Sequence, residues 1–452
     1  MRSKAVLLLF AVFVALLAVV LFLKPKVKEE AELKLTDLKA EDVLKISLTK
    51  AEESLVFEKD DSGEWAVTRP LAAAADAFEV NRLAEDFASL KIEKVVEAET
   101  DDPSQFGIPQ TEVSLWLKGT AEPVTIAVGS ENPLDKTLYA QKKGDPRIVL
   151  LPSFLKSTLD KTLLDFRQKD VFRFETTEAG GLRVKSKDTN WEAELREGEW
   201  FLQKPVSGLA QKTQMDALLN TLSGLRAKEF AVEQKTGADL KTFGLDKPDF
   251  EAAVTLPKAG QTIVFFVRKL GDKVYATTAA SNKIVQVEEQ ILTDLDRRPD
   301  SLREKRPAVF NAWEAARLEI RKDGLSLAVS RKQDGSWEFL SGETGPADES
   351  KVETFIRLVG SLETVEFLDA PGPAASYGLD RPSAEVKVLV PLESGTARET
   401  VLLFGTEDKA NGEVVVKNPR FAYLFRTSAS LLADFPAAAA DWKKTESKDK
   451  TE

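Results

Sequence analysis

The residues best able to do chemistry in this chain are its paired carboxylates. Two Asp or Glu side chains that converge on one cleft can act on a glycosidic bond, and several together can hold a divalent cation. The pairs include Glu52 with Glu53, Asp60 with Asp61, Asp101 with Asp102, Asp294 with Asp296, and Glu407 with Asp408. Most lie in turn-like, polar stretches, and none recurs at a matching position of the repeats described below. We therefore interpret them as solvated surface residues.

The chain contains no cysteine and no histidine. Disulfides, thiolate nucleophiles, Cys/His zinc sites and lipid attachment to cysteine are therefore excluded, as is every catalytic triad or dyad that uses histidine. There is no EF-hand spacing and no phosphate-binding loop. A Ser–Lys dyad stays open, but nothing singles out one serine and one lysine. We expect no enzymatic activity, no metal and no cofactor.

Composition and charge describe a globular protein that does not bind nucleic acid. The 452 residues are 43% hydrophobic and 30% charged, and the length fits about three domains of typical size. The formal net charge is −11, whereas nucleic-acid binding needs a basic face. Basic pairs such as Arg297 with Arg298 and Lys142 with Lys143 are isolated, and we interpret them as surface residues.

A short motif that occurs three times is the most distinctive feature of the sequence. An aromatic residue and a glycine are followed by a branched aliphatic residue and then a proline. The copies contain Phe106, Gly107 and Pro109; Phe243, Gly244, Asp246 and Pro248; and Tyr377, Gly378, Asp380 and Pro382, with starts 137 and 134 residues apart. We predict a structural role, in which glycine permits a positive φ, the aromatic anchors the loop and proline fixes the next strand. Asp246 and Asp380 could cap a turn, and a role in binding a ligand or partner stays open.

Three tryptophans place the same predicted elements around each copy of the motif. Trp65, Trp200 and Trp337 lie 135 and 137 residues apart, each two residues after a turn-forming glycine and downstream of strand-like runs. A helix with apolar residues at i, i+3, i+4, i+7 and i+10 begins 15 residues after each tryptophan. Its positions are Val80, Leu83, Ala84, Phe87 and Leu90; Met215, Leu218, Leu219, Leu222 and Leu225; and Val352, Phe355, Ile356, Val359 and Leu362. We expect the tryptophans to lie in the cores rather than to bind sugar or lipid.

The segments after the motif complete a repeating α+β unit. Apolar residues alternate after each proline, which predicts a half-buried strand, and three more predicted strands follow in each unit. A closing helix is then predicted at 152–164, 288–295 and 428–435. Each unit is thus two antiparallel β-meanders with amphipathic helices, an α+β class. The predicted repeats span 37–168, 169–305 and 306–442, and the charged tail at 443–452 is expected to be disordered. Without Pro- or Ser-rich linkers, the repeats are expected to pack end to end as an elongated rod.

The N-terminus predicts a membrane anchor within residues 1–23. Residues 5–23 are an uninterrupted apolar run that follows Arg2 and Lys4, and as a helix they would be about 28 Å long, which matches the bilayer hydrocarbon. The following Lys24 and Pro25 make a poor cleavage site, so an uncleaved anchor is favoured over a signal peptide. Residues 24–36 form a charged stalk. Positive charges flank both ends of the run, and we favour export of the large C-terminal part.

This combination of features resembles the bacterial family called domain of unknown function 4340. The resemblance rests on the anchor, the tryptophan strand, the helix, the motif at 243–248 and the segment Leu302-Arg303-Glu304-Lys305 that closes repeat 2. It covers nearly the whole chain after the anchor. Repeat 1 departs from it, because its motif lacks two residues before the proline and residues 164–169 match loosely. Family members often accompany gliding-motility-type ABC transport systems, so the resemblance implies an envelope-facing accessory protein in the bacterial inner membrane. It implies no catalytic residue.

The sequence leaves three functions open. The first is a non-enzymatic, membrane-anchored envelope protein that binds or scaffolds ABC-transporter subunits or other envelope proteins. The second is a module that binds envelope polysaccharide or lipid in grooves between repeats, which an open aromatic-lined cleft would favour and a filled interface would disfavour. The third is a hydrolase that uses carboxylates alone and needs two of them within about 10 Å in one pocket.

Overall fold

The computed structural model describes residues 33–51, 53–100, 102–392 and 396–445. The predicted anchor at 5–23, most of the stalk and residues 446–452 of the tail lie outside these ranges. Within these ranges, no helix is both long and apolar enough to cross a bilayer. The chain forms two compact units, one that ends at Lys169 and one that begins at Asp170. The second unit contains both repeat 2 and repeat 3.

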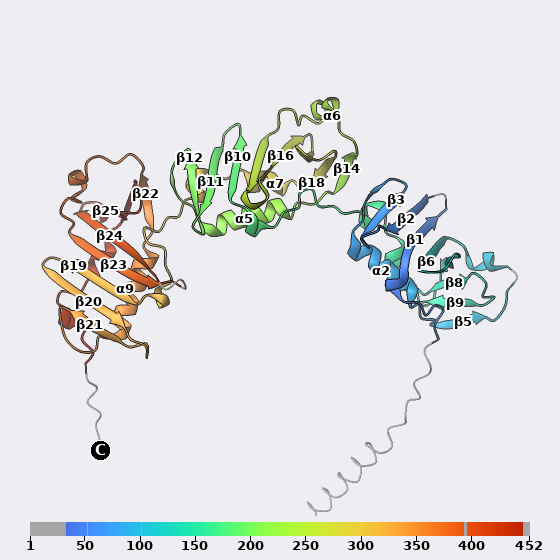
Figure 1. Ribbon diagram of the computed structural model, residues 1–452, viewed down its shortest axis with the longest axis horizontal. Coiled ribbons are helices and arrows are strands. Elements are labelled where there is room, and N and C mark those ends of the chain that lie inside the picture. Colours follow the sequence, from blue (N-terminus) through green and yellow to red (C-terminus); the bar gives the residue numbers. More distant parts are fainter. Residues whose placement is uncertain (1–32, 52, 101, 393–395, 446–452) are drawn as a thin grey trace, which may run out of the picture. The chain divides into compact units, whose positions relative to one another are not determined.

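The described residues form three antiparallel sheets of nine, nine and eight strands (Figure 1). These sheets with their short helices confirm the α+β class. In each sheet the first strand of the repeat lies near the centre, where it pairs both with the second strand and with the strand that follows the motif. In each sheet the two meanders are therefore joined by the pairing of the first strand with the strand that follows the motif.

Repeat 1 has the strand order β4-β3-β2-β1-β6-β7-β8-β9-β5. Its strands are β1 (Val43–Lys50), β2 (Glu53–Lys59), β3 (Trp65–Arg69), β4 (Ala73–Ala74), β5 (Lys94–Glu97), β6 (Thr111–Leu117), β7 (Val124–Glu131), β8 (Leu138–Lys142) and β9 (Ile148–Leu151). Its helices are α2 (Ala77–Ala88), α3 (Leu155–Leu159) and α4 (Leu163–Phe166), with 3-10 helices η1 (Ala40–Asp42) and η2 (Pro103–Phe106).

Repeat 2 has the matching order β13-β12-β11-β10-β15-β16-β17-β18-β14. Its strands are β10 (Gly181–Ser186), β11 (Asn190–Arg196), β12 (Glu199–Lys204), β13 (Gly208–Leu209), β14 (Glu229–Val232), β15 (Phe250–Leu256), β16 (Gln261–Leu270), β17 (Lys273–Thr278) and β18 (Ile284–Val287). Its helices are α5 (Lys212–Ser223), α6 (Gly237–Thr242), α7 (Gln290–Leu295) and α8 (Pro299–Leu302), with η3 (Thr176–Glu178) and η4 (Pro257–Ala259).

Repeat 3 has the order β21-β20-β19-β23-β24-β25-β26-β22. Its strands are β19 (Arg317–Lys322), β20 (Leu325–Arg331), β21 (Trp337–Ser341), β22 (Thr364–Leu368), β23 (Ala384–Pro391), β24 (Ala397–Asp408), β25 (Glu413–Lys417) and β26 (Leu424–Ser428). Its helix is α9 (Glu349–Ser361), with 3-10 helices η5 (Ala312–Glu314), η6 (Ala374–Tyr377), η7 (Ser430–Ala433) and η8 (Ala439–Trp442).

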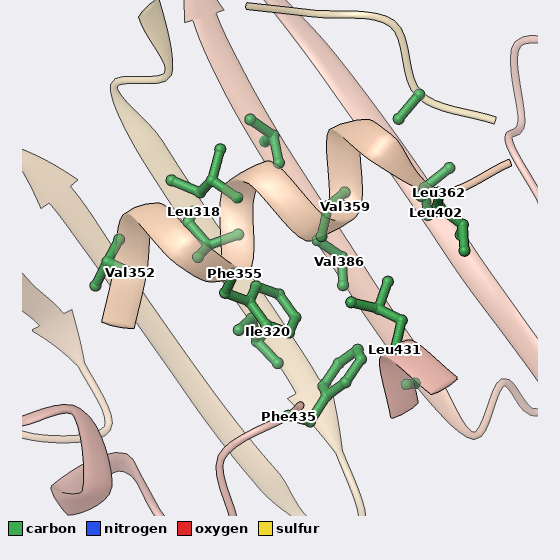
Figure 2. Packing of buried hydrophobic residues seen from close by; sticks show 14 of the residues in the cluster. Leu318, Ile320, Val352, Phe355, Val359, Leu362, Val386, Leu402, Leu431 and Phe435 are labelled. Atoms are coloured by element: carbon green, nitrogen blue, oxygen red, sulfur yellow. The ribbon is translucent and has the colours of Figure 1, made fainter. Parts of the chain in front are cut away.

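The predicted helices are α2, α5 and α9, and each buries its predicted stripe against a sheet. In repeat 3, Phe355 and Val359 of α9 face Ile320 of β19 and Val386 of β23, and Phe435 closes the core from the C-terminal segment (Figure 2). The three helices begin differently. Asp76 and Asp348 accept hydrogen bonds from backbone N–H groups of the first turns of α2 and α9, whereas the residue before α5, Gln211, makes no side-chain cap.

All three repeat tryptophans are buried in the cores. Trp65, Trp200 and Trp337 are 5%, 4% and 1% exposed, and each belongs to the apolar cluster beneath the helix of its repeat. The indole Nε1–H of Trp65 donates a hydrogen bond of 2.7 Å to Asn81 of α2. Burial of a ring this large against helix and sheet contributes stability to each repeat.

Candidate functional site

The repeated motif lies on the face of each sheet opposite the long helix. In repeat 2, Tyr275 stands between the core residues Val274 and Ala276 of β17, so alternation points its side chain away from α5. Phe243 packs against Tyr275 with ring centroids 4.8 Å apart, and Leu245 beside it is 3% exposed. Phe106 packs on Tyr139 at 5.0 Å in repeat 1, and in repeat 3 Tyr377 joins a small cluster with Leu379, Val415 and Leu424. The motif thus covers the second face of each sheet.

The motif glycines adopt backbone conformations that other residues rarely adopt. Gly107, Gly244 and Gly378 have φ angles of +71°, +67° and +71°. A Cβ atom on Gly107 would lie 2.1 Å from Oγ of Ser130, and one on Gly378 would lie 2.2 Å from Oγ1 of Thr406. These two positions require glycine for both the left-handed conformation and the close approach of the neighbouring strand. The prolines Pro109, Pro248 and Pro382 then lead into β6, β15 and β23.

The two motif aspartates do not make the caps that the sequence allowed. Asp246 and Asp380 are exposed, and within the described ranges neither carboxylate accepts a hydrogen bond or forms an ion pair. The carboxylate of the neighbouring Asp249, by contrast, accepts two hydrogen bonds, from Nη1 of Arg268 at 2.5 Å and from the backbone N–H of Lys269 at 2.8 Å. The motif aspartates therefore have no structural role that these contacts can explain.

The paired carboxylates that the structure describes mostly build turns. Asp60 accepts hydrogen bonds from the Ser62 hydroxyl and from the backbone N–H groups of Ser62 and Glu64, and these bonds hold the pKa of its carboxyl below the usual range. Asp408 accepts from Asn411 and from the N–H of Ala410, with the same effect on its pKa. Over the described ranges, no group of three or more Asp and Glu side chains is placed to hold a metal ion.

Three neighbouring cavities form where repeat 2 meets repeat 3 within the second unit. Their volumes are about 230, 330 and 460 Å³. The first two share Glu199, and the first and third share Arg420 and Phe421. This junction is the candidate functional site. None of these three residues was singled out by the sequence, because they belong to strands and loops far apart along the chain.

A buried arginine fixes one side of the junction. Arg303, which follows α8, is 0% exposed, and its Nη1 donates to Oδ2 of Asp369 at 3.0 Å. Nη2 lies 2.8 Å from Oδ1, close enough for an ion pair although it is not aligned for a hydrogen bond. The guanidinium stacks over Phe367 at 3.7 Å and over Tyr423 at 4.6 Å. A charge this deeply buried is tolerated only because a carboxylate and two rings surround it.

A tyrosine and a loop of repeat 2 complete that side. The Tyr423 hydroxyl accepts a hydrogen bond from the backbone N–H of Leu209 in β13 at 3.3 Å. Burial raises the pKa of this hydroxyl above its ordinary value. Gly208 leaves room for both groups, since a Cβ there would lie 3.2 Å from Nε of Arg303 and 3.2 Å from the Tyr423 hydroxyl.

A single carboxylate fixes the other side of the junction. Glu199 of β12 accepts from Nη1 of Arg398 at 3.2 Å through Oε1, and from Nη2 of Arg420 through Oε2. Its side chain is 18% exposed, against 41% and 42% for the two arginines. Both oxygens of Glu199 are therefore engaged by arginines across the junction.

The largest of the three cavities, called the junction cavity below, is lined by aromatic side chains from both repeats. It has a volume of about 460 Å³. Its lining is Phe201, Pro205, Val206, Ser207 and Gly208 from repeat 2, and Asp369, Arg420, Phe421, Ala422 and Tyr423 from repeat 3. Phe421 stacks on Tyr423 with centroids 5.1 Å apart and ring planes at 17°. Polar and apolar groups both line it, and its volume lies within the range of small-molecule sites.

Comparison with known proteins identifies a family. The sequence model described as "Domain of unknown function (DUF4340)" matches residues 65–248, 200–374 and 337–448. Each match begins at a repeat tryptophan and runs across the predicted boundary towards the next repeat or the C-terminus. The three matches confirm the tandem repetition.

The other comparisons are uninformative about function. No curated protein gives a significant match. Among solved structures, a DNA polymerase sliding clamp from Pseudomonas aeruginosa, crystallised with a ligand, is 9% identical over 87% of this chain and 93% of the clamp, with a TM-score of 0.15. The DNA polymerase III subunit beta from the same organism gives 9% identity, 85% and 92% coverage, and a TM-score of 0.15. A TM-score this low carries no information about the present fold.

Proposed function

Because the chain belongs to the DUF4340 family, we propose that it is a non-enzymatic, membrane-anchored envelope protein that binds subunits of an ABC-type transport system. In this proposal, residues 5–23 anchor it in the bacterial inner membrane and its repeats lie on the periplasmic side. The observation that carries the proposal is that ion pairs and buried side chains hold repeats 2 and 3 together at their junction. A buried Arg303 and a shared Glu199 hold the two repeats in one compact unit, and such a unit can present fixed surfaces to a partner.

Exposed apolar residues on repeat 3 give the proposal its candidate contact surfaces. Trp313 in η5 is 73% exposed, and Val365 in the edge strand β22 is 66% exposed. Tryptophan is enriched among the residues that dominate binding energy in protein interfaces, and an edge strand can pair with a strand of another protein. Tethering to the same membrane would raise the local concentration of the partner, so modest affinity would suffice.

The test is site-specific crosslinking in native membranes. A photo-reactive amino acid would replace Trp313 or Val365 in the full chain, with the exposed Asp188 as the control position. We expect ABC-transporter subunits to crosslink at position 313 or 365 and not at 188. The proposal loses its basis if no transporter subunit is captured from position 313 or 365, or if position 188 captures the same subunits equally well. Protease access in intact and permeabilised cells would establish the orientation.

A second candidate function, the binding of envelope polysaccharide, is favoured by one observation. The junction cavity is lined by Phe201, Phe421 and Tyr423 and is open enough to receive a ligand. A completely filled interface between the repeats would have disfavoured polysaccharide binding. The test is co-sedimentation of the full chain with insoluble envelope polysaccharide, and an unbound chain would contradict it.

A further inference from the structure

The charges around the junction cavity favour a neutral ligand. Its lining holds one carboxylate, Asp369, and one guanidinium, Arg420. Each is already paired with a residue outside the lining, Asp369 with Arg303 and Arg420 with Glu199. An ionic ligand would have to compete with these existing pairs and would be desolvated against a lining with no net charge. A polar but uncharged ligand meets no such cost.

The aromatic rings favour a ligand with an apolar face. Arg420 lies 5.4 Å from the ring of Phe201 and 5.6 Å from the ring of Phe421, so the guanidinium is close to both rings. Phe201 and Phe421 are both partly exposed, whereas Tyr423 behind Phe421 is 5% exposed. Phe421 therefore stacks on Tyr423 with one face and contributes part of its remaining surface to the cavity.

The polar groups of the cavity retain hydrogen-bonding capacity. The side chains of Asp369 and Arg420 are each 42% exposed although both are paired. A carboxylate has about four acceptor positions and a guanidinium has five N–H donors, so each can bind a hydroxyl in addition to its ion-pair partner. The Ser207 hydroxyl at the cavity edge is exposed and can donate or accept.

We propose that the junction cavity binds one neutral pyranose unit of an envelope saccharide. The C–H face of the sugar ring would pack on Phe421, with Asp369 accepting from its hydroxyls and Arg420 donating to them. This inference rests on the second proposed function, to which it adds the site and the ligand class. Because both repeats line the cavity, the sugar would bind only when the junction is closed, and binding would stabilise the junction by mass action.

The experiment measures sugar binding to the full chain in a detergent without a sugar head group. Saturation-transfer NMR would be recorded with glucose, galactose and N-acetylglucosamine, and with adenosine as a planar ligand that is not a pyranose. We expect saturable binding of at least one pyranose and none of adenosine. Ser207→Trp, which adds bulk at an exposed position of the lining, and Phe421→Ala, which removes the stacking surface, should each weaken the binding at least tenfold.

The matched control is Phe78→Ala, which removes an exposed aromatic residue outside the lining and should leave sugar binding unchanged. The inference is overturned if no pyranose binds, if only adenosine binds, or if both cavity variants bind sugar as tightly as the parent chain. The co-sedimentation assay separates this inference from the function on which it rests. If the parent chain and both cavity variants all sediment with polysaccharide, the glycan site lies elsewhere in the chain. If the parent chain does not sediment, the protein lacks the proposed polysaccharide-binding function itself.

Discussion

Arg303 at the end of repeat 2 forms an ion pair with Asp369 of repeat 3, in which Nη2 lies 2.8 Å from Oδ1 and the arginine side chain is 1% exposed while the carboxylate is 42% exposed. The two partners thus differ sharply in their contact with water. Loss of the carboxylate would leave a guanidinium unpaired in the interior, whereas loss of the arginine would leave a carboxylate that water can still solvate.

This difference predicts unequal effects of substitution at the two positions. Asp369→Ala should destabilise the second unit by about 3–5 kcal/mol, because a buried charge loses its partner. Arg303→Met, which removes the charge and retains an apolar stem against Phe367, should cost clearly less. Urea unfolding of the full chain, followed by the transition of the second unit, would measure both.

The control for this prediction is Asp216→Ala. Asp216 has a similar exposure of 43%, but its partner Lys212 is 71% exposed, so the loss should stay below about 1 kcal/mol. Equal losses for Asp216→Ala and Asp369→Ala would show that the burial of Arg303 does not govern the energetics of the pair.

The ion pairs of Glu199 with two arginines should stabilise the junction, and this stabilisation should depend on salt concentration. Glu199→Gln should remove the charge that both Arg398 and Arg420 contact and should destabilise the second unit by about 1–2 kcal/mol at low ionic strength. The difference between Glu199→Gln and the parent chain should shrink as salt rises, because the two arginines are partly exposed and the Debye length falls below about 10 Å above 0.1 M salt. Unfolding midpoints at 0.05 and 0.5 M NaCl would test this, and a difference that is constant across salt would contradict it.

Gly378, the left-handed glycine of the third motif, predicts that its substitution by alanine destabilises the protein in two ways: through a steric clash and through backbone strain. The two contributions can be measured separately. Gly378→Ala should destabilise repeat 3 by about 2–4 kcal/mol, since the new Cβ would meet Oγ1 of Thr406 at 2.2 Å and its backbone N at 2.8 Å. Gly412→Ala is the matched control, because Gly412 has a φ of +65° and no atom within 4 Å of the added Cβ. It should cost only about 1 kcal/mol, from the backbone alone. Thermal unfolding of both variants would decide, and similar losses would refute the steric part.

The raised pKa of Tyr423 predicts a loss of stability at alkaline pH. Since the folded pKa lies above the unfolded value of about 10, the unfolded chain releases this proton first as pH rises. The contribution of the neutral hydroxyl is therefore fully present below about pH 10 and is lost as pH rises from there through the folded pKa. Unfolding of the parent chain and of Tyr423→Phe at pH 8 and at about pH 11 would test it. The parent chain should lose more stability than the variant over that interval, and parallel losses would contradict the prediction.

Much of each repeat could be predicted because its pattern is local. The stripe from Val352 to Leu362 has the period of a helix, and the helix α9 buries Val352, Phe355, Ile356 and Val359. The alternation after Pro382 likewise gave β23, in which Val386, Val388 and Val390 face the core. In both cases, a residue's neighbours along the chain determine which side of the element is apolar.

Of the three closing helices, the one expected over 288–295 is present as α7 (Gln290–Leu295). The other two were predicted less well, for a reason that is also local. The helix expected over 152–164 is divided into α3 and α4, because Thr162 and Asp165 form a capping box that begins a new helix. The segment at 428–435 forms only the 3-10 helix η7. Apolar spacing alone did not distinguish a continuous helix from short turns that bury the same residues.

The candidate site could not be predicted from these patterns. Arg303 stood in the sequence as part of a segment that closes repeat 2, with no sign that it would be buried. Its partner Asp369 is 66 residues further along the chain, and Glu199 is 221 residues from Arg420. These pairs depend on how one repeat packs on the next, which no local period encodes.

The central position of the first strand in each sheet has a mechanical consequence for a tethered protein. In repeat 1, β1 is the first strand after the proposed anchor and is hydrogen-bonded along one side to β2 and along the other to β6. Tension transmitted through the stalk would therefore pull on a strand that is held on both sides, so two ladders would have to shear together before the sheet opened. A strand at the edge of the sheet would instead peel away one hydrogen bond at a time. The topology thus places β1, which follows the proposed anchor in the sequence, where the sheet resists pulling force best.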